Sequence, residues 1–222
     1  MKKALIISDS MAMPRVELKY EDTWVFKLQQ NIKSIHFINR TSRGANSNRL
    51  IEEGGDSLEF YNPDIVILQL GIVDCAPRYL KQTSFHYRFI NHLPKIIQFL
   101  FWKTLKKIKK RDVKNADVPV DKFKSNLTSY FNRCILHNVK KIIVIKIPTP
   151  ARQMIERNAG ICEAVKTYNL IYDEFALNNS LIEVVNPLSH GDEAVYIDGY
   201  HPNKLGNDLI YNSLNKELKC LK

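Results

Sequence analysis

The sequence lacks any apolar run long enough to cross a bilayer, because no stretch reaches the roughly 18–20 residues that a membrane span requires. At the start of the chain, Lys2 and Lys3 precede only four apolar residues, which leaves no room for a secretory signal. We therefore expect a cytoplasmic protein, which could still lie peripherally at the inner face of the membrane.

Cysteine is scarce, and its spacing excludes the usual cysteine-based sites. Cys75, Cys134, Cys162 and Cys220 lie far apart with no C-x-x-C pair. This pattern indicates reduced core thiols rather than a zinc site or a disulfide framework. The loop 189–193 contains a histidine and two acidic residues, but no matching cluster elsewhere, so we expect no metal site.

Acidic residues are fewer than basic ones, 23 against 33, which gives a formal charge of +10. Residues 95–114 contain eight basic residues and one acid, Asp112, together with the apolar run 96–102. This segment has several interpretations: an ordinary helix with a core-facing side, a lid, a contact in a homo-oligomer, or a contact with an anionic membrane surface or substrate. No nucleic-acid motif accompanies the charge, so nucleic acid is not an expected partner.

What is present is an alternation of short apolar runs and longer amphipathic ones over 222 residues. The predicted strands are Ala4–Asp9, Ser34–Asn39, Asp64–Leu70, Lys141–Ile147 and Leu181–Val185. The predicted helices are Val16–Asn31, Ala45–Glu53, Tyr87–Lys110, Asp121–His137, Ile155–Asn178 and Asn203–Leu218. Such an alternation predicts an α/β fold with a doubly wound parallel sheet between helical layers. We expect one domain over 1–222, with Asp121 as an N-cap and a basic helical insertion around 78–120.

Two polar clusters at opposite ends of the chain suggest nucleophilic catalysis. Ser10 follows the first strand, at the edge of the sheet where such folds place reactive groups. Asp198 and His201 stand three positions apart before the last predicted helix. Together they predict that Ser10 attacks, His201 accepts its proton and Asp198 orients the imidazole, while Asp9 caps or braces the turn beside Ser10.

These residues belong to four blocks, in order, that resemble those of the SGNH hydrolases, or GDSL esterases. The blocks are Ser8-Asp9-Ser10-Met11, the loop 39–47 with Gly44, Gly71-Ile72-Val73-Asp74, and Asp198-Gly199-Tyr200-His201. The resemblance implies a flavodoxin-like five-stranded sheet of order 2-1-3-4-5, an oxyanion contact from the Gly44 amide, and no cofactor. Residues 71–78 also resemble a variant third block of SGNH proteins from bacterial surface-polysaccharide loci.

The sequence departs from the family pattern at two positions. Ser8 stands in place of the leading glycine, and we interpret Asp74 as replacing the asparagine that would donate to the oxyanion. Asp74 is expected either to be protonated by burial or to pair with Arg78, which could instead clamp a carboxylate or phosphate of the substrate. Asn46 is a candidate replacement for the missing amide donor.

These residues favour a serine esterase that removes a small acyl group from a carbohydrate through an acyl-enzyme on Ser10. The acyl group that we expect is acetyl. The expected partner is an acylated carbohydrate or polysaccharide precursor. One alternative is a carbohydrate O-acyltransferase of surface-polysaccharide biosynthesis, which shares the first half of the reaction. The other is a catalytically weakened protein that binds glycans on an SGNH-like fold.

Overall fold

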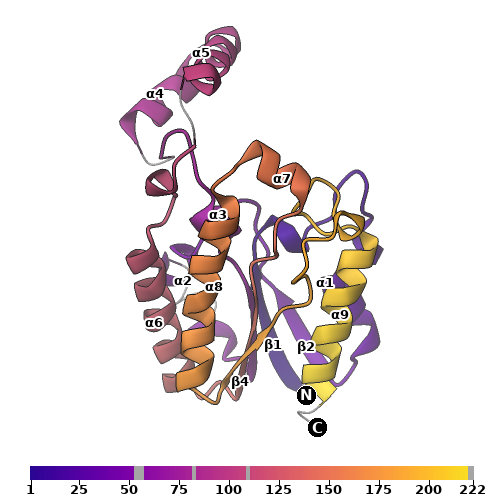
Figure 1. The fold of residues 1–222 in the computed structure, drawn as a ribbon. Coiled ribbons are helices and arrows are strands. Elements are labelled where there is room, and N and C mark those ends of the chain that lie inside the picture. Colours follow the sequence, from indigo (N-terminus) through magenta and orange to yellow (C-terminus); the bar gives the residue numbers. More distant parts are fainter. Residues whose placement is uncertain (53–57, 82–83, 109–110, 220–222) are drawn as a thin grey trace.

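The structure is a computed structural model that describes residues 1–52, 58–81, 84–108 and 111–219 (Figure 1). Its centre is a five-stranded parallel sheet of order β2-β1-β3-β4-β5, which confirms the order that the resemblance implies. The strands are β1 Lys2–Ser8, β2 Ile35–Asn39, β3 Ile65–Gln69, β4 Lys141–Ile145 and β5 Ile182–Val185. Each lies within two residues of its predicted bounds.

Helices cover both faces of the sheet, so the molecule has three layers (Figure 1). Figure 1 shows α6 and α8 on one face, and α1 and α9 on the other. The α-helices are α1 Trp24–Asn31, α2 Arg49–Glu52, α3 Ile72–Cys75, α4 Phe85–His92, α5 Lys95–Ile108, α6 Val120–Leu136, α7 Arg152–Arg157, α8 Ile161–Asn178 and α9 Lys204–Lys219. The predicted α/β/α architecture is confirmed.

The two-residue period of a strand divides β1 between two hydrophobic cores. Leu5 and Ile7 point into the core that α6 and α8 close, whereas Ala4 and Ile6 point into the core that α1 and α9 close. All four side chains are buried. Burial on both faces explains why this strand is continuously apolar rather than alternating.

The first helix begins later than predicted. It starts at Trp24 rather than at Val16, because the Thr23 hydroxyl accepts a hydrogen bond from the Phe26 amide and caps the helix there. The Trp24 amide donates to the buried Asn207 of α9 at 3.0 Å, which ties the start of α1 to α9.

Four other helix predictions need correction, one of them for α2, which begins at Arg49 rather than at Ala45. The predicted helix Tyr87–Lys110 is two helices, because Pro94 cannot donate the hydrogen bond that would continue α4 into α5. The predicted helix Ile155–Asn178 is also divided, into α7 and α8, at residues 158–160. Asp121 is not the N-cap of α6: that position belongs to Pro119, and Asp121 lies in the first turn.

The segment expected to form a basic insertion contains α4, α5 and the 3₁₀ turn Val113–Asn115. None of the helices within the described ranges combines the length and apolar composition needed to cross a bilayer. The cysteine prediction is wrong for Cys162, which is exposed, whereas Cys75 and Cys134 are buried. Glu53, Lys110 and Cys220, which the predictions included, lie outside the described residues.

Candidate functional site

Ser10 is held in a tight turn directly after β1. It begins the 3₁₀ helix η1 Ser10–Ala12, and the Asp9 carboxylate caps this helix by accepting from the Met11 amide at 2.8 Å. The predicted bracing role of Asp9 is therefore confirmed. Ser8, in place of the family glycine, is fully buried and donates its hydroxyl to Gln69 Oε1 at 3.1 Å. The backbone thus accommodates a side chain at this position.

Ser10, His201 and Asp198 form a continuous chain of hydrogen-bond contacts. Ser10 Oγ lies 3.1 Å from His201 Nε2, although 191 positions separate the two residues in the sequence. His201 Nδ1 lies 2.7 Å from Asp198 Oδ2, and the other carboxylate oxygen accepts from the His201 backbone amide at 3.0 Å. These distances are those of a nucleophile, its base and an orienting carboxylate.

The surroundings of the two partners favour a neutral histidine beside an ionised aspartate. Burial raises the pKa of Asp198, but the hydrogen bonds from His201 outweigh this effect and lower it to about 2. Burial lowers the pKa of His201 below its ordinary value, and the positive charges of Arg15 and Arg43 add to this, while the Asp198 carboxylate opposes it. Neutral imidazole with a free Nε2 lone pair is the form that accepts a proton from serine.

The loop carrying Asp198 and His201 is packed tightly against α7. Gly199 has φ +92°, and a Cβ there would come within 2.7 Å of the Met154 amide nitrogen. The Gly199 carbonyl accepts from the Ala151 amide at 2.8 Å. Tyr200 covers the imidazole, with ring centroids 3.9 Å apart. Glycine is therefore required at position 199 by both backbone conformation and space.

Gly44 lies on the loop after β2, which is fastened to β1. The Ser42 amide donates to the Ser8 carbonyl at 3.0 Å, and Gly44 has φ +72° with open space around its Cβ position. Among the residues described, the amide groups of Ser10 and Gly44 donate to no other group. Both N–H groups are available to bind an oxyanion, the role predicted for Gly44.

Asp74 does not occupy the position of the family asparagine, so that interpretation is wrong. The third block of the SGNH hydrolases has the pattern G-x-N-D. Read from Gly71, this pattern places Val73 at the asparagine position and Asp74 at the aspartate. Val73 is partly exposed, whereas Asp74 is fully buried and accepts from the Ser47 amide at 2.8 Å. Burial raises the pKa of Asp74 to about 6. Asp74 therefore joins the loop after β2 to α3.

The predicted pairing of Asp74 with Arg78 is also wrong. Arg78 forms an ion pair with the nearly buried Asp117 at 2.9 Å. Its backbone also bridges to Asp112, since each amide donates to the other's carbonyl. Arg78 therefore fastens the two ends of the segment that contains α4 and α5.

Asn46 and its neighbours belong to a polar network behind the Gly44 loop. Asn46 Oδ1 accepts from the Asn48 amide at 3.1 Å and so stabilises the turn before α2. The buried Asn126 of α6 donates to Ser47 Oγ at 3.0 Å and to Asn48 Oδ1 at 2.9 Å. Asn126 carried no sequence signal, because its partners lie almost 80 positions away.

A pocket of about 280 Å³ lies beside Ser10. Its other lining residues are Met13, Pro14, Arg15, Val16, Glu17 and Arg43. Neither arginine was among the predicted site residues, although Arg15 closely follows the first block and Arg43 directly precedes Gly44.

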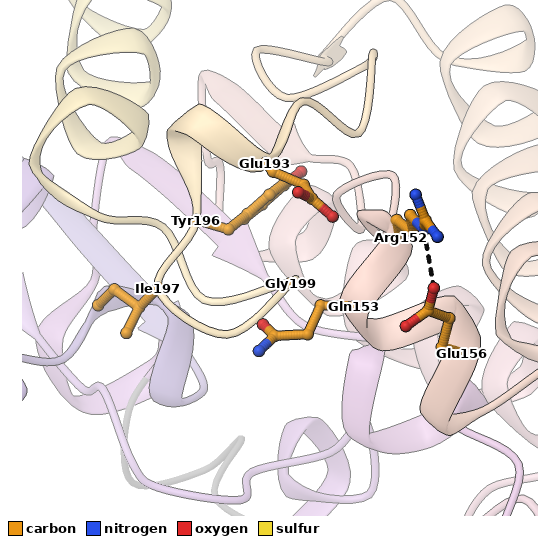
Figure 2. A pocket seen from close by; sticks show the side chains of 7 residues that line it. All are labelled: Arg152, Gln153, Glu156, Glu193, Tyr196, Ile197 and Gly199. Carbon is orange, nitrogen blue, oxygen red and sulfur yellow. Dashed lines mark hydrogen bonds and ion pairs between the residues drawn. The ribbon is translucent and has the colours of Figure 1, made fainter.

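A second, larger pocket of about 500 Å³ lies between α7 and the loop 193–199 (Figure 2). Figure 2 shows the exposed Arg152–Glu156 ion pair on its α7 side. Neither Ser10 nor His201 lines this pocket. We assign the chemistry to the smaller pocket because the nucleophile lies in its wall.

Solved structures with the same fold include several ester-cleaving proteins. A GDSL-like lipase from Bacteroides thetaiotaomicron has TM-score 0.64 and 15% identity, and the match covers 100% of this chain and 89% of that one. A lipase/acylhydrolase from Enterococcus faecalis has TM-score 0.64 and 18% identity, with 99% and 96% covered. A catalytic mutant of Axe2, an acetylxylan esterase from Geobacillus stearothermophilus, has TM-score 0.60 and 15% identity, with 97% and 93% covered.

No protein-family model matches this sequence, and no curated protein sequence matches it. At such low identity, the likeness to the solved structures concerns the fold. The chain has the three-layer α/β/α fold of the SGNH, or GDSL, hydrolases.

The first prediction concerns the pH dependence of ester cleavage. We expect kcat/KM for a soluble ester to be full above the pKa of His201 and to fall below it, because protonated imidazole cannot act as a base. The midpoint is expected below the ordinary histidine value of 6.5, since burial disfavours the charged ring.

Asp198→Asn should lower kcat by on the order of 10²–10⁴-fold. Asp192→Asn, which removes an exposed carboxylate from a nearby loop, is the control. A midpoint above 6.5 would contradict the burial argument.

The second prediction concerns Val73. Val73→Asn supplies the side-chain amide that the family places at this position, so it should raise kcat for an activated short-chain ester by about 10-fold or more. Val73→Asp has nearly the same shape, but its ionised carboxylate cannot donate, so it should give no gain. Equal rates for the Asn and Asp variants would show that position 73 does not reach the oxyanion.

Proposed function

We propose that this protein is a serine esterase that removes a small acyl group from a carbohydrate. The acyl group that we favour is acetyl. The observation that carries the proposal is the contact chain from Ser10 Oγ through His201 to Asp198, at 3.1 Å and 2.7 Å. The fold and its ester-cleaving neighbours, one of them an acetylxylan esterase, support the same reaction class.

In the proposed mechanism, Ser10 Oγ attacks the ester carbonyl carbon while His201 Nε2 accepts the hydroxyl proton. The resulting oxyanion is stabilised by the backbone N–H groups of Ser10 and Gly44. His201 then donates the proton to the departing sugar oxygen, which leaves an acyl group on Ser10. Water attacks this acyl-enzyme with His201 again as the base, and the carboxylic acid leaves. Every step uses side chains and backbone amides of this chain.

The small acyl group is supported by the dimensions of the pocket beside Ser10. Its volume of about 280 Å³ lies just below the range, roughly 300–1,000 Å³, that ligand pockets occupy. The charged side chains of Arg15, Glu17 and Arg43 share its wall with Met13, Pro14 and Val16, and they offer polar partners for hydroxyl groups. A polar alcohol such as a sugar is therefore the better match for the leaving group.

A catalytically weakened glycan-binding protein is the second candidate, and Val73 is the observation that favours it. Valine at the asparagine position removes one oxyanion donor, a loss that costs about 10²–10³ in rate elsewhere. An O-acyltransferase shares the first half of the proposed mechanism and differs only in the alcohol that replaces water.

The third prediction tests the acyl-enzyme. A fluorophosphonate probe should add its mass to Ser10, because the activated hydroxyl attacks phosphorus as it attacks a carbonyl. Ser10→Ala should abolish the labelling and the hydrolysis of a short-chain aryl ester. Ser125→Ala, which removes an exposed serine from α6, should leave both unchanged. Full activity in the Ser10→Ala protein would rule out the mechanism. A sugar acceptor that diverts the acyl group from water would establish the transferase instead.

A further inference from the structure

The helices α4 and α5 form a hairpin that projects from the body of the molecule (Figure 1). The turn between them is closed by Gln98 Nε2, which donates to the carbonyls of Leu93 at 2.8 Å and Asn91 at 3.0 Å. Tyr87 of α4 contacts Trp102 of α5, with ring centroids 5.7 Å apart. The hairpin thus uses one side of α5 to pack against α4.

Both helices of the hairpin expose large apolar residues. Ile96, Ile97, Phe99 and Leu100 lie on one side of α5 and are 76%, 47%, 64% and 54% exposed. On α4, Phe85 and Phe89 stack with their centroids 6.0 Å apart and are 76% and 56% exposed. The core-facing interpretation of this apolar side is therefore wrong, and the surface is one that soluble proteins seldom leave uncovered.

The charged side chains in and around the hairpin are all basic. Residues 75–111 contain ten lysines and arginines and no aspartate or glutamate. The Lys103 ammonium lies 5.9 Å from the centroid of the Phe99 ring, so charge and apolar surface are interleaved on the same helix. Long basic side chains beside aromatic ones are typical of helices at the boundary between lipid headgroups and acyl chains.

We propose that the α4–α5 hairpin docks on a membrane surface that contains anionic lipid. The exposed apolar side chains of α5 would enter the headgroup region while the lysines and arginines contact lipid phosphates. Figure 1 shows the hairpin beyond the end of the sheet at which α3 and α7 lie. Ser10 follows the same end of β1, so docking would bring the candidate site towards the bilayer.

The fourth prediction is binding to vesicles. Wild-type protein should co-sediment with vesicles of phosphatidylcholine and phosphatidylglycerol, and at least 10-fold less with phosphatidylcholine alone. Added salt should weaken the binding, because the screening length falls from about 10 Å at 0.1 M to about 3 Å at 1 M. The double variant Ile96→Ser/Phe99→Ser should lose at least 10-fold in vesicle affinity.

The matched control is Leu136→Ser/Leu177→Ser, which removes two side chains of similar size, 77% and 86% exposed, from α6 and α8. It should bind as the wild type does, and the thermal unfolding of both double variants shows that they are folded. Equal binding to neutral and anionic vesicles would overturn the proposal. So would self-association abolished by Ile96→Ser/Phe99→Ser without any vesicle binding, since the hairpin would then be a contact between copies of this chain.

A different observation supports a second inference, about the substrate of the proposed esterase. Arg15 and Arg43 line the pocket beside Ser10, and no ion pair holds either guanidinium within the described part of the chain. Arg15 is partly buried at the turn that follows η1, and Arg43 is exposed next to Gly44. Glu17 is the one acidic residue in the pocket wall, so the pocket keeps an excess of positive charge.

We infer that Arg15 and Arg43 bind a carboxylate or phosphate that the acylated carbohydrate carries near its ester. Guanidinium groups bind both anions through paired N–H donors, so the chemistry is shared by an acidic sugar and a sugar phosphate. This inference rests on the proposed esterase function, and it names the class of substrate.

The fifth prediction compares three substrates: acetylated glucuronic acid, acetylated glucose 6-phosphate and acetylated glucose. Wild-type kcat/KM should be higher for at least one of the two anionic substrates than for acetylated glucose. The anionic substrate with the higher value identifies the anion that the arginines bind. Arg15→Gln and Arg43→Gln should each lower the anionic-to-neutral ratio by about 10-fold, as expected when a hydrogen bond to a charged group is lost. Arg157→Gln, which removes an exposed arginine from the end of α7, should keep the ratio. Equal turnover of all three substrates would overturn this inference alone, whereas inactivity on every ester would overturn the esterase.

Discussion

β1 is hydrogen-bonded to β2 along one edge and to β3 along the other, and the candidate site depends on this pairing. Because the three strands are parallel, their carboxyl ends lie at one edge of the sheet, and the strand order reverses between β1 and β3. Ser10, the Gly44 loop and α3 therefore start side by side. Hydrogen bonds from Ser42 to the Ser8 carbonyl and from Ser47 to Asp74 then hold the loops together.

Two buried carboxyl groups lie beneath this edge, and each has a structural reason to be there. Burial raises the pKa of Asp9 to about 7 and that of Asp74 to about 6. Burying a carboxyl group costs free energy unless backbone donors compensate it. The Asp9 carboxyl group accepts a hydrogen bond from the Met11 amide, and that of Asp74 accepts one from the Ser47 amide. Each carboxyl group therefore fixes a turn at the site. The two carboxyl groups thus stabilise the backbone around Ser10, while their burial makes them harder to ionise.

The sequence predicted the strands well, and it named three residues that the structure places in contact, Ser10, His201 and Asp198. Strands buried on both faces are continuously apolar, and a triad uses residue types that stand in recognisable local blocks. The assignment of Asp74 failed because a shift of one position in a short helical turn exchanges a buried side chain for a partly exposed one. Local sequence could not reveal the Arg78–Asp117 pair or the Asn126 network, which depend on how distant segments pack.

The apolar run 96–102 left open what covers the helix that contains it. A pattern of this kind shows that one side of a helix avoids water, but it does not show what covers that side. Pro94 was the visible signal that the helix would break, and its effect was underestimated. The two arginines beside Ser10 were missed because a pocket is formed by segments whose proximity appears only in three dimensions.

The 191 positions between Ser10 and His201 bear on how the protein acquires its site. Ser10 is synthesised before His201, and α1 donates its first amide to Asn207 on the helix that follows His201. Contacts that span nearly the whole chain form slowly compared with local ones. A nascent chain therefore carries Ser10 without its histidine partner until residue 201 has been made.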